Sequence, residues 1–78
     1  MENQSTTDRV VEVCAWIRSG RAREIREQNG LTLGELAQDC DVTHTAILRW
    51  ERGERRPRGR NAIAYHRVLS RLGAREAV

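Results

Sequence analysis

Two threonines, Thr32 and Thr43, constrain what this chain can fold into more than any other feature. Each stands at the start of a short run with helical periodicity, residues 32–40 and 43–52. Thr32 is followed three residues later by Glu35, which is the capping-box pattern of a helix start, and Thr43 is placed to cap the second run. The turn between the runs is too short for antiparallel helices. The sequence therefore predicts two short helices that meet at an angle.

The rest of the chain is also helical in pattern. Apolar residues recur at intervals of three and four in residues 8–18 and in the segment that follows, which is typical of amphipathic helices. Gly20 predicts a break between these segments, and Gly30 a left-handed residue at the end of the second. No segment shows sustained strand alternation, so the predicted fold is all-α, a compact bundle of four to five short helices. The last helix is expected to run from about Arg60 to Leu72, with an apolar set of Ile63, Tyr65, Val68, Leu69 and Leu72.

The chain is expected to form one domain with short tails. Its 78 residues suffice for one small core but not for a second domain. The predicted divisions are a disordered N-terminus (1–7), a single domain (8–73) made of an extension helix (8–18) and a core (19–73), and a C-terminal tail (74–78). Thr7 or Asp8 is placed to cap the extension helix.

The basic residues are unusual in kind. All fourteen are arginine and none is lysine, and the net charge is +3. Guanidinium groups form paired hydrogen bonds with phosphate, which favours a nucleic-acid partner, whereas the codon usage of a GC-rich genome explains the same bias without selection. The positions of the arginines are therefore more informative than their number. Arginines crowd residues 52–60, the arginine segment, around the only proline, Pro57. Pro57 and Gly59 oppose helix continuation, so we expect a loop there.

Several classes of function lack the residues they need. No apolar run is long enough to span a membrane and no signal-peptide pattern is present, so a cytoplasmic protein is expected. Cys14, Cys40, His44 and His66 have neither the CxxC nor the HxxxH spacing of a zinc site. The cysteines are expected to be reduced, and no metal or other cofactor is expected. No nucleophile has a base at suitable spacing and no phosphate-binding loop is present, so neither an enzyme nor a small-molecule ligand is expected.

Residues 19–73 resemble the helix-turn-helix domain of the phage repressor and Cro type, the XRE family. The resemblance is carried by "I-R-E-x-x-G-L-T-x-x-E-L-A", which begins at Ile25, and "V-T-x-x-A-I-x-R-W-E-R-G-x-R-x-P", which begins at Val42. It implies that Arg26 and Glu51 form a structural salt bridge. It also implies that the outward face of the second helix touches base edges, through His44, Thr45, Leu48 and Arg49.

The resemblance further implies contacts with the DNA backbone. In the resembling repressors the segment after the second helix runs along the backbone near the centre of the operator. The residues expected at phosphates or in the minor groove are Thr32, Thr43, Arg52, Arg55, Arg56, Arg58 and Arg60. "R-P-R-G-R" also looks like the core of an AT-hook, which lies extended in a narrow A·T-rich minor groove. Arg58 is the best candidate for that groove, with Arg60 second, and simple phosphate contacts are the alternative.

Three positions depart from the family pattern. Asp41 replaces the usual turn glycine, which aspartate tolerates because it adopts left-handed conformations more readily than most residues. Leu33 stands where many relatives have a polar residue that bonds phosphate, so that contact falls to the backbone amide or to Thr32. The segment before Ser19 is either an extra core helix or a dimer surface.

The function implied is that of a sequence-specific regulator of transcription that binds double-stranded DNA. It would be a Cro-like or repressor-like protein of a phage or bacterium, associated with the nucleoid of the bacterial host. Two alternatives remain open: an antitoxin or other module that binds a protein partner, and an arginine-rich RNA binder. Relatives often dimerise so that two helices enter successive major grooves, and both a monomer and a homodimer on DNA remain open.

Overall fold

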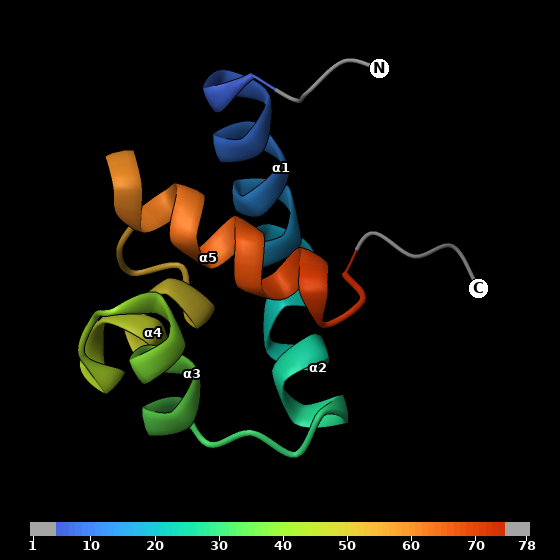
Figure 1. Ribbon diagram of the computed structural model, residues 1–78, viewed down its shortest axis with the longest axis vertical. Helices are drawn as coiled ribbons and strands as arrows, with labels where there is room; N and C mark the ends of the chain where they lie inside the picture. Colours follow the sequence, from blue (N-terminus) through green and yellow to red (C-terminus); the bar gives the residue numbers. More distant parts are fainter. Residues whose placement is uncertain (1–4, 75–78) are drawn as a thin grey trace.

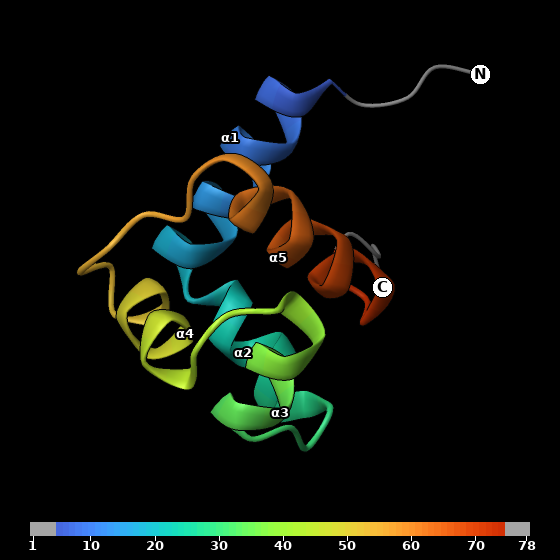
Figure 2. The same ribbon diagram turned by 60° about the vertical axis from the view of Figure 1, so that its left-hand side comes forward.

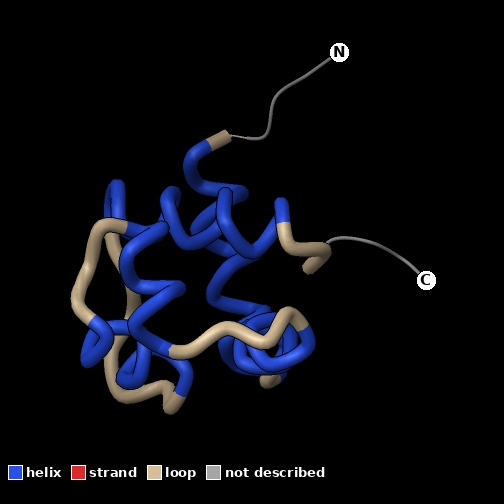
Figure 3. Tube along the Cα trace, turned by 60° about the horizontal axis from the view of Figure 1, so that its bottom comes forward, coloured by secondary structure: helices blue, strands red, loops and turns tan. Residues whose placement is uncertain are grey.

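The computed structural model describes residues 5–74, and this part of the chain consists of helices and loops without a strand (Figure 3). The five helices are α1 (Thr6–Ser19), α2 (Arg21–Gln28), α3 (Leu33–Cys40), α4 (His44–Glu51) and α5 (Gly59–Arg71). Helix α5 crosses α1, while α3 and α4 lie together on one side of the bundle (Figure 1). The predicted all-α bundle of four to five short helices is confirmed.

The ends of the described chain differ from the expected boundaries. Helix α1 begins at Thr6 because the Ser5 hydroxyl, not Thr7 or Asp8, caps it and accepts a hydrogen bond from the Asp8 backbone N–H at 3.0 Å. Thr6 and Thr7 therefore lie in the first turn of α1, within the segment 1–7 that was expected to precede the domain. Ala74, expected in the tail, is buried, and its N–H bonds to the Leu69 carbonyl at 2.9 Å. Residues 1–4 and 75–78 lie outside the described residues.

Gly20 separates α1 from α2, which confirms the predicted break. Its backbone is left-handed, with φ 84°, and its N–H bonds to the Ile17 carbonyl at 3.1 Å. A side chain is strained in this conformation, whereas glycine adopts it freely. The chain therefore changes direction within one residue, and α1 and α2 can both contact α5.

The core gathers residues from all five helices. Completely or almost completely buried are Val13, Ile25, Leu36, Ile47, Tyr65 and Leu69. Each fully buried aliphatic side chain contributes about 1.5 to 3 kcal/mol to the hydrophobic stabilisation. Because Val13 belongs to this set, α1 is part of the core.

Helix α5 buries a polar residue that the sequence pattern did not single out. His66 is 5% exposed and stacks on Trp16 of α1, with ring centroids 5.0 Å apart. Its Nε2 lies 2.7 Å from Oε1 of Glu12, also on α1. Of the expected apolar set, Tyr65, Val68 and Leu69 are buried, Leu72 is partly buried against the core, and Ile63 is partly exposed. The contact between α1 and α5 is therefore partly polar.

Candidate nucleic-acid interface

The turn between α3 and α4 is fixed by backbone hydrogen bonds. Asp41 is left-handed, with φ 58° and ψ 46°, as expected for this position, and its N–H points back to the carbonyls of Ala37 and Gln38. The N–H of Val42 bonds to the Ala37 carbonyl at 3.0 Å. These contacts satisfy carbonyls at the end of α3 that would otherwise lack partners. The turn therefore sets the direction in which α4 leaves.

Both helices of this pair begin with the predicted caps. The Thr32 hydroxyl accepts a hydrogen bond from the Glu35 N–H at 3.0 Å, and the Glu35 carboxylate accepts one from the Thr32 N–H at 2.8 Å. The Thr43 hydroxyl accepts a hydrogen bond from the Ala46 N–H at 3.1 Å. In each case the hydroxyl accepts, so its own O–H can still donate. A phosphate oxygen, which only accepts hydrogen bonds, is a suitable partner for either threonine.

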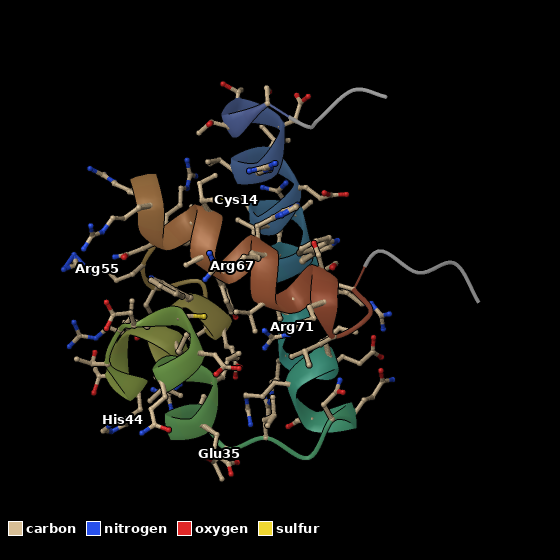
Figure 4. All side chains as sticks on the ribbon, in the orientation of Figure 1. Cys14, Glu35, His44, Arg55, Arg67 and Arg71 are labelled. Carbon is tan, nitrogen blue, oxygen red and sulfur yellow. The ribbon has the colours of Figure 1, made fainter. Side chains whose placement is uncertain are left out.

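Helix α4 has one buried and one exposed face. Ile47 is 0% exposed and Trp50 is 4% exposed, and the Trp50 ring lies against that of Tyr65, with centroids 4.9 Å apart. The outer face carries His44, Thr45 and Arg49, which are exposed, and Leu48, which is partly exposed. In Figure 4, His44 points away from the body of the protein. The four residues predicted to touch bases therefore share one accessible helix face.

The chemistry of this face suits the edges of base pairs in a major groove. The Arg49 guanidinium makes no ion pair with another described residue, and its paired N–H groups match the O6 and N7 acceptors of guanine. Leu48 and the methyl group of Thr45 offer apolar contact for a thymine methyl. An α-helix with its side chains is about 10–12 Å across, which fits a groove about 12 Å wide.

A buried ion pair holds the end of α4 to α2. Arg26 donates through Nε to Oε2 of Glu51 at 2.6 Å and through Nη2 to Oε1 at 3.0 Å, and its Nη1 donates to the Leu31 carbonyl at 2.9 Å. The Arg26 side chain is 13% exposed and that of Glu51 3%. The hydrogen bond to Glu51 raises the pKa of the Arg26 guanidinium. The structure thus brings Arg26 and Glu51 together in a position that fixes α4.

The segment that follows α4 is anchored at both ends. Its first residues fold back on the helix, because the N–H groups of Glu54 and Arg55 both bond to the Arg49 carbonyl, at 2.9 and 3.3 Å. Pro57 is completely buried, while Arg56 and Arg58 on either side of it are exposed. Figure 2 shows this connection at the edge of the protein, and Arg55 points outward in Figure 4.

The structure divides the arginine segment into two parts. Arg52, Arg55 and Arg56 line one groove together with residues of α1. Arg60 belongs to the first turn of α5 and lines a different hollow, beside Asp39 and Asp41. Gly59, with φ 53°, starts α5, so the predicted loop ends at Arg58 and the "P-R-G-R" run is not extended along its whole length.

The other polar and thiol side chains that could carry chemistry are the possible metal ligands, the two cysteines and the Tyr65 hydroxyl. Among residues 5–74, no three His, Cys, Asp or Glu side chains come close enough to hold a metal ion. Cys14 and Cys40 are free thiols, and burial raises the pKa of Cys40 to about 11. The Tyr65 hydroxyl is buried without a hydrogen-bond partner in the described part of the chain. None of the described helices is long and apolar enough to cross a membrane.

The fold and this site together define a class of protein. Two capped helices joined by a tight turn, the second with an exposed polar face, form a helix-turn-helix. A profile of the helix-turn-helix family matches residues 23–71, and the chain belongs to this family, in its XRE branch. Searches of curated proteins and of solved structures give no match. The family consists of DNA-binding domains rather than enzymes, and the protein is a DNA-binding regulator of the XRE type.

Proposed function

We propose that this protein regulates transcription by sequence-specific binding to double-stranded DNA, as a Cro-like or repressor-like protein of a phage or bacterium. The observation that carries the proposal is the accessible face of α4, with His44, Thr45, Leu48 and Arg49 on a helix held by the Thr43 cap and the Arg26–Glu51 ion pair. A helix fixed in this way loses little further conformational freedom on binding. The protein would act in the cytoplasm of the bacterial host, at the nucleoid, by occupying a promoter.

The arginine segment is proposed to hold the DNA backbone beside the α4 face. Arg52, Arg55 and Arg56 are exposed, and guanidinium groups bind phosphate with two hydrogen bonds. Thr32 and Thr43 each retain a hydroxyl proton for the same purpose. Arg58 follows the buried Pro57 and has extended backbone, with φ −132° and ψ 155°. It is our candidate for the minor groove, with Arg60 at a phosphate.

We propose that two copies bind one operator. An eight-residue helix is about 12 Å long and spans about four base pairs. So short a site recurs too often in a genome to identify one promoter. Two copies on successive major grooves read twice as many base pairs.

In vitro selection of duplexes from a random DNA pool tests the proposal. The expected outcome is enrichment of a short motif that contains guanine, and binding of the winner whose logarithm falls with log salt concentration with a slope of about −0.9 per phosphate neutralised. Absence of enrichment, with equally weak binding to every duplex, would contradict base recognition. That outcome would favour an arginine-rich RNA binder, which competition with hairpin RNA reveals, or a module that binds a protein partner.

A further inference from the structure

A groove of about 950 Å³ separates α1 from the first half of the arginine segment. Its α1 wall carries the apolar side chains of Val10, Val11, Cys14 and Ile17. Arginines surround it, with Arg18 from α1 and Arg52, Arg55 and Arg56 from the segment after α4. The groove therefore combines an apolar wall with a basic rim.

One residue of the apolar wall, Val11, is exposed, whereas Val10, Cys14 and Ile17 are partly buried and pack against the core. Val11 is 61% exposed and is the only large exposed hydrophobic residue in the described part of the chain. Val13, two residues further on in α1, is completely buried in the core, with 0% exposure. Each aliphatic side chain left in water forgoes stabilisation that burial would give. Val11 thus gains a favourable environment only when something covers the groove.

The rim carries an excess of positive charge. Of the two carboxylates on the groove wall, Glu51 is neutralised by Arg26, and Glu54 lies 3.9 Å from one arginine, Arg52. Arg18, Arg55 and Arg56 make no ion pair with another described residue. The occupant that complements this rim is therefore an anion.

A DNA backbone complements the basic rim of the groove but not its apolar wall. Its phosphates suit the guanidinium groups, but it has no aliphatic groups for the wall formed by Val10, Val11, Cys14 and Ile17. A second copy of this chain, paired groove to groove, would supply aliphatic side chains for the wall. It would also bring two sets of like-charged arginines together, which is unfavourable. A protein segment with both aliphatic and acidic side chains meets both requirements.

We propose that this groove binds an acidic, aliphatic segment of another protein, which competes with DNA. Aliphatic side chains of the partner would cover Val11 and Cys14, and its carboxylates would pair with Arg18, Arg52, Arg55 and Arg56. The competition rests on the proposed function, because Arg52, Arg55 and Arg56 are there assigned to phosphates. A partner in the groove occupies the same guanidinium groups and releases the regulator from its operator.

Selection of displayed random peptides on the full chain, without DNA, tests the groove. Enriched peptides should combine Asp or Glu with Leu, Ile or Val. Val11→Glu places a carboxylate in the groove and should lower the affinity for the selected peptide by about tenfold or more. Ala15→Glu is the matched control, since Ala15 is exposed one turn along α1, outside the groove lining, and it should change the affinity by less than about twofold.

The other outcomes overturn the groove proposal. Enriched peptides without acidic residues, equal effects of both variants, or no enrichment would each do so. A chain that is dimeric without peptide, and monomeric only as Val11→Glu, would assign the groove to a second copy. Because the peptide assay contains no DNA, its result is separate from that of operator binding. Competition is then measured by adding the peptide to the complex of the protein with the selected duplex. A peptide that binds the protein without displacing DNA would overturn the release mechanism but not the proposal that the groove binds such a segment.

Discussion

At the scale of single residues, Arg49 carries most of the proposed base recognition. Its guanidinium is exposed on the outer face of α4 without an ion-pair partner among the described residues. Arg49→Ala should therefore leave the fold intact, weaken operator binding by about 1 to 3 kcal/mol and relax the preference at one base pair. The measurement is a titration of the selected duplex and of its single base-pair variants.

A matched charge loss distinguishes base recognition from simple attraction to DNA. Arg23→Ala removes an exposed arginine from α2, where its side chain is 65% exposed and paired only with Glu27. It should weaken all duplexes slightly and equally. If Arg49→Ala behaves in the same way, Arg49 does not recognise a base.

Cys40 gives the folded protein a predictable dependence on alkaline pH. Burial raises the pKa of its thiol from 9.0 to about 11, so between these values the folded state binds the proton more tightly than the unfolded state. The stabilisation is complete below pH 9 and is lost as the pH rises toward 11. The free energy of unfolding should fall with a slope of at most about 1.4 kcal/mol per pH unit in this range.

Urea unfolding from neutral pH to about pH 10 measures this slope. Cys40→Ala removes the titrating group, so its unfolding free energy should fall less steeply than that of the wild type, although the variant is less stable overall because of the small cavity. Parallel slopes for the two proteins would show that the thiol is not the group responsible.

At the scale of elements, the Arg26–Glu51 ion pair joins α2 to the end of α4. Glu51→Gln keeps the shape of the side chain but leaves the Arg26 charge, 13% exposed, without its counterion. Breaking a buried pair in this way should cost about 3 kcal/mol, a large part of the stability of a small domain. Glu54→Gln, at a carboxylate 54% exposed, should change the unfolding free energy by less than about 0.5 kcal/mol. Chemical denaturation of both variants compares them directly.

The loop between α4 and α5 offers a separate test of minor-groove contact. Arg58→Ala should weaken binding most for sites with A·T pairs beside the motif recognised by α4, because a narrow A·T-rich groove concentrates negative potential. Arg55→Ala should weaken A·T-flanked and G·C-flanked sites equally, as expected for a phosphate contact. An equal loss for both variants on both sites would leave Arg58 with a phosphate role.

Local signals explain why the elements were predictable and some of their contacts were not. The caps at Thr32 and Thr43 and the left-handed Asp41 depend on residues a few positions apart, so the sequence indicates them. The stacking of His66 on Trp16 depends on how α5 crosses α1, which no local pattern encodes. The last helix was predicted within one residue at its start, at about Arg60 against the observed Gly59, whereas the burial of Pro57 depends on tertiary packing.

At the scale of the whole molecule, two-fold symmetry of the operator is the expected sign of a dimer. The described part of the chain is 34 Å in its longest dimension, close to one turn of B-DNA. Two copies side by side can therefore place their α4 helices in successive major grooves. The selected duplex should contain two inverted copies of one short motif with centres about 34 Å apart. Sedimentation of the protein with this duplex should give two chains per duplex, and a single unrepeated motif with one chain would identify a monomer.

Only the part of the candidate site that lies on a single helix, α4, was predictable from the sequence. Residues 44, 45, 48 and 49 share a face through helical spacing alone, and the structure leaves that face accessible. The α1 groove could not be predicted, because residues 10–18 and 51–56 are distant in the sequence and meet only in the folded chain. The separation of Arg60 from Arg55 and Arg56 has the same origin.

The choice of arginine throughout has a chemical consequence for how this protein can be modified and detected. All fourteen Lys or Arg positions are arginine, so the surface proposed to face DNA has no side-chain amine. Acetylation, which acts on lysine, cannot weaken this surface. Amine-directed cross-linkers would likewise fail to capture these side chains on DNA, whereas dicarbonyl reagents that modify arginine should map them, and bound DNA should protect the residues that it covers.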